Sequence, residues 1–297
     1  YTLAAGLRLP VLPFLFACTF IADTASFALP VSNPINIMVL DVFGGGLGPF
    51  LRYLLLPSLF CIVFNAILFT WLFRRDLRGR YRIEDLPTAV PPDLGFFRFA
   101  VAALAVIAVA YTAASAFQVP LSAIALAGAG LLLIGAAHYG QLDWRGLRKE
   151  ISWSLFVFIS GLFILIRGVE DLGLTAAFGR LLLDWAGTNP LQGILLVAGG
   201  SALGANLVNN VPMALVMTSA LDSTGAAAGH PPLVYATILG ADLGPNLTTV
   251  GSLATMLWLL ILRRKGIEIS TLEYFKLGIV VVPVMIMVGA LLIWLVA

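Results

Sequence analysis

The sequence has few charges, few cysteines and few histidines, and each shortage excludes classes of protein. Only 11% of its 297 residues are charged, while 60% are hydrophobic and the mean hydropathy is +1.01; soluble domains carry about 25% charged residues. Two cysteines, Cys18 and Cys61, cannot form a disulfide framework. Two histidines without metal-ligand spacing predict no metal site, and no Gly-rich phosphate loop of the Walker type is present. We expect an all-α polytopic membrane protein that is not an enzyme, without cofactor or nucleic-acid partner.

Long charge-free stretches separate the charged residues. None lies between Arg98 and Asp143, between Asp184 and Asp222, or after Lys276. A helix needs about 20 apolar residues to cross a hydrocarbon core of about 30 Å. The predicted spans are 10–43 (interrupted), 52–73, 96–116, 119–137, 152–168, 192–220 (a special case), 232–262 (interrupted) and 275–297.

Basic clusters predict the orientation. Arginines and lysines gather at 74–82, 145–149 and 263–265, and cytoplasmic loops carry such an excess. If all three clusters are cytoplasmic, residues 192–220 must cross the bilayer an even number of times. Their two apolar pieces meet at residues 205–212, where three asparagines and Pro212 would be costly against lipid. This pattern predicts a re-entrant hairpin with a polar tip; the alternative is one helix kinked at Pro212.

A short motif occurs twice, 219 residues apart. Asp23 is followed by Pro/Asn-rich residues 30–36, and Asp242 by Gly/Thr-rich residues 249–255. The second copy ends at the basic cluster 263–265, whereas the first ends near Asp41 without a basic residue. Two similar units of opposite orientation are typical of secondary transporters, whose sites lie where discontinuous helices meet at midplane.

The breaks in these helices predict a polar site. Pro30, Pro34 and Pro245 remove backbone donors, so neighbouring side chains must share the freed groups. Asp23 and Asp242 are the acids far from any predicted loop, and an intramembrane carboxylate indicates function by default. We expect proton or cation coupling by both, with helix capping as the simpler alternative. The polar side chains near the breaks are Ser26, Ser32, Asn33, Asn36, Asn246, Thr248, Thr249 and Ser252.

Two further features have simpler interpretations. Arg167, Glu170 and Asp171 predict an ion cluster at the outer interface rather than a transport site. Residues 170–187 read as an amphipathic interfacial segment, with Arg180 and Asp184 on one face.

Several motifs resemble one known family. Residues 241–258 (ADLGPNLTTVGSLATMLW) followed by 262–266 (LRRKG) resemble the arsenite efflux permease family, described as arsenical pump membrane proteins, of the ion transporter superfamily. Residues 20–26 (FIADTAS), 31–37 (VSNPINI) and the hairpin 204–212 (GANLVNNVP) are similar to it too, in the same order.

The resemblance implies an inner-membrane carrier of bacteria that exports arsenite or antimonite. Export would be coupled to protons or driven with a soluble ATPase subunit, and a homodimer is compatible. The family has an earlier hairpin upstream of the Ala-Asp motif, so we expect an N-terminally incomplete sequence. By analogy, the substrate site is lined by Asn33, Asn36, Asn206, Asn209, Asn210, Asn246, Thr248 and Ser252.

The motif order predicts the domain organisation. The expected segments are a first transport unit (1–73), a cytoplasmic linker (74–94), scaffold helices with the amphipathic segment (95–190), a second transport unit (191–262), and a cytoplasmic loop with the last transmembrane helix (263–297).

The chemistry of the site leaves alternatives open. Amide and hydroxyl side chains suit arsenite, which is largely an uncharged trihydroxide at neutral pH. Cys18 lies close to the first break, but a tight thiolate bond would hinder release, so we do not expect it to be a ligand. The alternatives are a sodium-coupled importer of carboxylates or a sodium/proton transporter of the same superfamily, and an inert membrane scaffold subunit.

Overall fold

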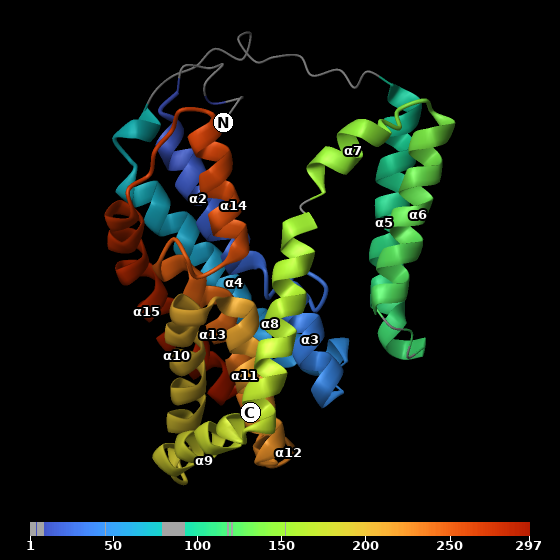
Figure 1. Cartoon of the computed structure of the whole chain (residues 1–297). Helices are drawn as coiled ribbons and strands as arrows, with labels where there is room; N and C mark the ends of the chain where they lie inside the picture. Colours follow the sequence, from blue (N-terminus) through green and yellow to red (C-terminus); the bar gives the residue numbers. More distant parts are fainter. Residues whose placement is uncertain are drawn as a thin grey trace. The chain divides into compact units, whose positions relative to one another are not determined.

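The computed structural model describes residues 4, 9–44, 46–78, 93–117, 119, 121–151 and 153–297. The chain divides into two compact units, 1–86 with 162–297 and 87–161. Helices are the only regular secondary structure in the described residues (Figure 1), which confirms the all-α class. The linker expected at 74–94 lies mostly outside the described residues, and the division into transport and scaffold segments stays a prediction.

Within the described residues, four helices are long and apolar enough to cross a membrane. They are α4 (Leu47–Leu72), α5 over Leu94–Tyr111, α10 (Pro190–Val208) and α15 (Thr271–Leu295). The chain is therefore a multi-pass membrane protein, as its composition predicts.

The smaller unit contains a pair of antiparallel helices, α5 (Leu94–Phe117) and α6 (Leu121–His138), followed by α7 (Trp144–Glu150). Gly135 of α6 faces the ring of Phe99, and Gly128 faces Ile107, about two turns further along α5. The absence of a side chain at these glycines lets the two helices approach closely. The helices expected at 96–116 and 119–137 are confirmed.

The first predicted break is present in the larger unit. Helix α2 (Val11–Ala25) ends before the connection 26–33, and α3 (Pro34–Phe43) follows. Asn33 caps α3 by accepting a hydrogen bond from the backbone N–H of Ile35 (3.1 Å), and Pro34 occupies the first helical position, where no donor is needed. Helix α4 and a short turn, η1 (Asp76–Arg78), come next.

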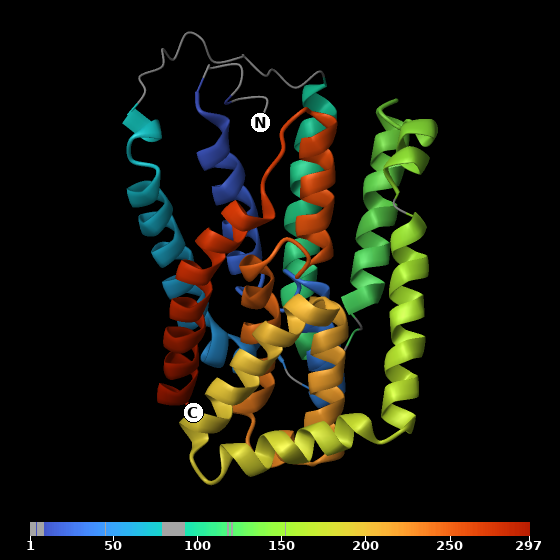
Figure 2. The same ribbon diagram turned by 60° about the vertical axis from the view of Figure 1, so that its left-hand side comes forward.

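Residues 190–223 form a helical hairpin rather than one continuous helix. Helix α10 and α11 (Asn210–Ser223) are joined at Asn209 (Figure 2). Gly204 lies against Met213 and Gly200 against Met217, so the two helices run antiparallel. The hairpin has the shape expected, but its re-entrant position in the membrane stays a prediction, because α10 alone is long enough to cross.

The hairpin tip is tighter than the sequence predicts. We expected residues 205–212 to be an irregular polar connection, yet only Asn209 is non-helical. Pro212 is tolerated because it lies in the first turn of α11, whose backbone N–H groups have no partner within the helix. The turn is made at φ +78° and ψ 156° of Asn209, a region that is strained for a residue with a side chain, by about 1–3 kcal/mol.

The second predicted break follows the hairpin and the short helix α12 (Ala226–Gly229). Helix α13 (Pro232–Leu243) passes into a 3₁₀ turn, η3 (Gly244–Leu247), and α14 (Leu253–Arg264) begins after an irregular connection. Ser252 caps α14 by accepting from the backbone N–H of Thr255 (3.1 Å).

The two broken helices have the same spacing as the sequence motif and opposite directions. The starts of α3 (Pro34) and α14 (Leu253) are 219 residues apart (253 − 34), the offset of the sequence motif. In Figure 1, α2 and α3 run from the upper end of the larger unit downward, whereas α13 and α14 run upward. This arrangement is what an inverted repeat requires, and the repeat itself remains our interpretation.

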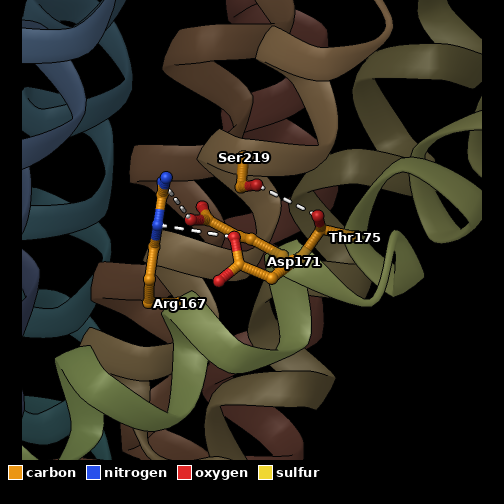
Figure 3. Close-up of polar contacts among 5 residues, drawn as sticks. Arg167, Asp171, Thr175 and Ser219 are labelled. Atoms are coloured by element: carbon orange, nitrogen blue, oxygen red, sulfur yellow. Dashed lines mark hydrogen bonds and ion pairs between the residues drawn. The ribbon is translucent and has the colours of Figure 1, made fainter.

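The connection from α8 (Trp153–Asp171) to α9 (Leu174–Ala186) packs against the hairpin. Arg167 pairs with Glu170 (3.2 Å) and Asp171 (3.6 Å) on an exposed surface (Figure 3), which confirms the ion pairs of the predicted cluster; its position at the outer interface stays a prediction. Ser219 of α11 donates to Thr175 of α9 (3.1 Å). This hydrogen bond joins the segment that we expected to be amphipathic, residues 170–187, to the hairpin.

Candidate functional site

The breaks of the two helices meet in one region of the larger unit, which we call the crossing. It contains the last turns of α2 and α13 and the first turns of α3 and α14. The side-chain amide of Asn33, at the start of α3, donates to Asp242 Oδ1 in the last turn of α13 (2.8 Å). Thr255, in the first turn of α14, faces Asp23 in the last turn of α2. Each repeat thus turns a polar side chain toward the aspartate of the other.

The two aspartates lie inside the crossing. Asp242 is 1% exposed, and Asp23 is partly buried with its Oδ2 atom covered. They are within electrostatic range of each other. The Ser26 hydroxyl faces Asp242 and donates to the main-chain oxygen of Asp23 (2.6 Å).

Asn36 stabilises the first connection. Its side-chain amide donates to the carbonyl oxygens of Ser26 (2.9 Å) and Leu29 (3.2 Å), which the break removes from helical hydrogen bonding. Its Oδ1 atom is buried and has no hydrogen-bond partner among the described residues.

Asn206 does the same for the second break. Its side-chain amide donates to the carbonyl oxygens of Ala202 (2.7 Å) and Gly244 (2.8 Å), and its Oδ1 accepts from the hydroxyl of Thr248 (2.7 Å). Both N–H groups of this amide and its oxygen thus have partners within the protein. Asn206 and Thr248, which we expected to contact substrate, therefore hold the broken helix against the hairpin in this structure.

The hairpin tip is fastened to the connection between η3 and α14. The backbone N–H of Asn210 donates to Gly251 O (2.9 Å), and the side chain of Asn209 donates to Val250 O (3.2 Å). These bonds stabilise the strained turn at Asn209.

Small residues let the hairpin and the second broken helix touch along their backbones. A Cβ at Gly240 would clash with the carbonyl oxygen of Ala198, and one at Gly244 would lie 2.6 Å from Ala202 Cα. A Cβ at Gly278 of α15 would clash with the carbonyl oxygen of Asn246. Helix contacts through small residues are typical of membrane proteins, and here they set the position of Asp242.

The remaining predicted residues differ in placement. Asn246 is fully buried, its amide lies 3.5 Å from Phe20 O, and its Oδ1 has no partner among the described residues. Thr249 and Ser252, which follow Asn246 closely in the sequence, are also buried, with 6% and 3% of their surface exposed. Ser32 is exposed, and in the described residues no polar side-chain contact joins it to the crossing.

Several buried polar residues near the crossing were not identified from the sequence. Tyr274, in the first turn of α15, is fully buried and within electrostatic range of Asp23, and Thr19 and Thr255 face its hydroxyl. Asn65 of α4 donates to the hydroxyl of Thr24, next to Asp23. Asn65 could have been found as a lone amide in a charge-free span; Tyr274 gave no such signal.

A cavity of about 370 Å³ lies at another place, between the end of α3 and the start of α13. Leu40, Asp222 and Tyr235 are among its lining residues, and none of the predicted site residues lines it. It is therefore distinct from the crossing.

The donor and acceptor balance of the crossing is uneven. No lysine or arginine occurs between Arg8 and Arg52 or between Arg180 and Arg263, the segments that build it. The buried side-chain oxygens in and around the crossing that lack a partner among the described residues include one hydroxyl, that of Tyr274; the others are the acceptors Asp23 Oδ2, Asn36 Oδ1, Asn65 Oδ1, Asn209 Oδ1, Asp242 Oδ2 and Asn246 Oδ1.

This architecture defines a polytopic α-helical membrane protein with two discontinuous helices around buried carboxylates. The sequence places it more narrowly. The profile of the family described as Arsenical pump membrane protein matches residues 6–295, and the chain belongs to this family. It is a multi-pass protein of the inner membrane.

Individual relatives agree with the family. The chain is 32% identical over 273 residues to the Arsenical pump membrane protein of Escherichia coli K12, covering 91% of this chain and 63% of the relative. It is 31% identical over 272 residues to the Arsenical pump membrane protein of Yersinia enterocolitica, covering 91% and 63%. The chain thus spans less than two thirds of the length of these curated relatives.

Proposed function

We propose that the full-length gene product exports arsenite or antimonite across the inner membrane in exchange for protons. The family and the printed names of its relatives support an arsenical substrate. The crossing supports a carrier, because transporter sites form where discontinuous helices meet inside the membrane.

The observation that carries this proposal is the excess of unpartnered acceptors at the crossing. A ligand that matches them must offer hydrogen-bond donors or positive charge. Uncharged arsenite carries three hydroxyl groups, each of which can donate to a carboxylate or amide oxygen. Unpaired buried acceptors cost roughly 1–3 kcal/mol each, so a hydroxyl-rich ligand would recover part of that free energy.

The same balance disfavours an anion such as a dicarboxylate. Helix N-termini often bind anions, but Asn33 and Ser252 already cap α3 and α14. The amides of Asn33, Asn36 and Asn206 donate to protein oxygens, and the segments that build the crossing contain no lysine or arginine.

We propose that the buried aspartates couple arsenite export to proton entry. In an alternating-access cycle, protons would enter from outside through Asp23, Asp242 or both, and would be released to the cytoplasm while arsenite leaves. A soluble ATPase subunit at the cytoplasmic loops and a homodimer are compatible with this cycle.

The full-length gene tests this proposal in cells that lack their own arsenite resistance. We expect growth at arsenite concentrations that stop the vector control, and lower cellular arsenic, with no dependence on external sodium. Equal arsenic content in both strains would contradict arsenite export. Sodium-dependent uptake of a carboxylate would instead favour the alternative function, and unchanged phenotypes after Asp23→Ala and Asp242→Ala would favour the scaffold.

A further inference from the structure

The two aspartates hold equivalent places in the repeats but have different neighbours. Asp242 is bound through Oδ1 to the amide of Asn33, and the nearby Ser26 hydroxyl already donates to a main-chain oxygen. Asp23 faces the hydroxyl group of Thr255, and the Tyr274 hydroxyl is within electrostatic range of it. An amide N–H can only donate, whereas a hydroxyl can donate to a carboxylate and accept from a carboxylic acid. Among the described residues, Asp242 thus has an amide partner that can only donate, whereas the groups that face Asp23 are hydroxyls, which can serve both protonation states.

Tyr274 provides the second observation. Its side chain is fully buried, and its hydroxyl has no hydrogen-bond partner within the described residues. A buried tyrosine hydroxyl normally finds a partner. Because Asp23, Thr255 and Thr19 surround this hydroxyl at electrostatic or hydrogen-bonding range, it is available to the Asp23 carboxyl group.

An aromatic cluster covers this group on one side. The Tyr274 ring lies 5.0 Å from that of Phe20, 6.3 Å from Phe16 and 6.4 Å from Trp258. Phe73, which stacks on Phe16, directly precedes the basic residues that follow α4, and Trp258 lies in the helix that ends at Arg264. These basic ends are cytoplasmic by the positive-inside rule. The cluster therefore separates Asp23 from the cytoplasm.

We infer that Asp23 is the proton-exchange group of the carrier, that Tyr274 and Thr255 position its proton, and that Asp242 is the fixed partner of Asn33. This inference rests on the proposed function. Asp23 takes a proton from the outer side and carries it inward as a carboxylic acid. It releases the proton to the cytoplasm when the aromatic cluster opens, so that one O–H bond forms and breaks in each cycle.

Among the described residues, two other titratable groups are within electrostatic range of Asp23. They are Asp242 on α13 and Tyr274 on α15. Helix α14 contributes the neutral Thr255, and α4 contributes Asn65, which reaches the adjacent Thr24.

The experiment compares Asp23→Asn, Asp242→Asn and Tyr274→Phe in the full-length protein. Uptake of arsenite into everted membrane vesicles is driven by an imposed pH gradient, and arsenite exchange is measured separately at equal pH on both sides. We expect Asp23→Asn to lose gradient-driven accumulation about tenfold or more while exchange continues. Asp242→Asn should keep the ratio of gradient-driven accumulation to exchange within about threefold of the wild-type ratio, because an asparagine oxygen can still accept from Asn33.

Tyr274→Phe should keep exchange but move the pH of half-maximal transport upward by about one unit, because a hydroxyl that donates to a carboxylate favours its charged form. Tyr53→Phe is the matched control, since the Tyr53 ring stacks on Tyr235 (4.6 Å) in another part of the unit, and its pH profile should not move. Immunoblots establish equal amounts of each variant.

The outcomes distinguish failure of the proposed function from failure of the role assigned to Asp23. If the wild-type protein moves no arsenite, the proposed function fails and this inference with it. If the wild type transports arsenite and Asp23→Asn still accumulates it with the pH gradient, only the inference is overturned. Loss of coupling in Asp242→Asn but not in Asp23→Asn would overturn it equally.

Discussion

Gly240→Ala is expected to remove most of the folded protein from the membrane. The added methyl group would clash with the carbonyl oxygen of Ala198, a backbone atom that cannot turn aside as a side chain can. Overpacking of this kind costs typically 1–3 kcal/mol and occasionally more. The measurement is the yield and melting temperature of the full-length protein in detergent, by size-exclusion chromatography with fluorescence detection.

Gly199→Ala is the matched control for Gly240→Ala. Gly199 lies on α10, the helix that Gly240 contacts, and a Cβ there meets nothing within 4 Å. Alanine is also the better helix former, by about 1 kcal/mol in an exposed position. A Gly240→Ala protein as stable as Gly199→Ala would contradict the close packing of α10 and α13.

Asn33→Asp is expected to reduce arsenite export about tenfold or more, and Asp242→Asn in the same protein should restore it. The single change places two carboxyl groups within hydrogen-bond distance, and like charges in one buried site disfavour the ionised form of both. The double variant exchanges donor and acceptor, so the hydrogen bond forms in the reverse direction. The readout is arsenite uptake into everted vesicles at equal protein amounts.

The control for the exchange is Asp23→Asn combined with Asn33→Asp. This double variant removes a carboxylate from the crossing as well, but it does not restore the contact between residues 33 and 242. Because Asp23→Asn alone should keep arsenite exchange, both double variants are also compared by exchange at equal pH on the two sides of the membrane, and in that assay this control should stay inactive. Recovery in this variant, or no recovery in the Asn33→Asp, Asp242→Asn protein, would contradict the observed pairing.

The sequence was sufficient to predict the breaks in the two helices, because proline, glycine and a lone aspartate in an apolar stretch have direct physical consequences. The breaks lie after Ala25 and Leu243, close to the predicted motifs. The hairpin at 190–223 followed from counting spans against the basic clusters. These features depend on local chemistry and on the membrane, which a single sequence records well.

The partners of each polar side chain could not be predicted. Asn206 and Asn33 are both asparagines near a break, yet Asn206 satisfies the backbone of its own repeat and Asn33 reaches Asp242, 209 residues away. Such pairings depend on how two helices cross, which no spacing within one motif specifies. Tyr274 was missed for the same reason, since it reaches the crossing from a helix outside both motifs.

The secondary structure of the hairpin tip also could not be predicted from the sequence. A run of polar residues at 205–212 predicts an irregular connection, but hydrogen bonds to Gly244, Val250 and Gly251 satisfy the polar groups and allow the helices to continue almost to each other. Tertiary partners thus extended secondary structure beyond what the local sequence favours.

The central claim is that the two broken helices meet at residues 33 and 242 inside the membrane. The direct measurement is thiol cross-linking in native membranes, with Asn33→Cys and Asp242→Cys introduced into a full-length protein whose Cys18 and Cys61 are replaced by serine. We predict that a short thiol-specific cross-linker joins this pair. It should not join Asn33→Cys to Ile261→Cys, which lies about 12 Å further along α14 from its first residue. Equal cross-linking of both pairs, or cross-linking of the Ile261→Cys pair alone, would contradict the account.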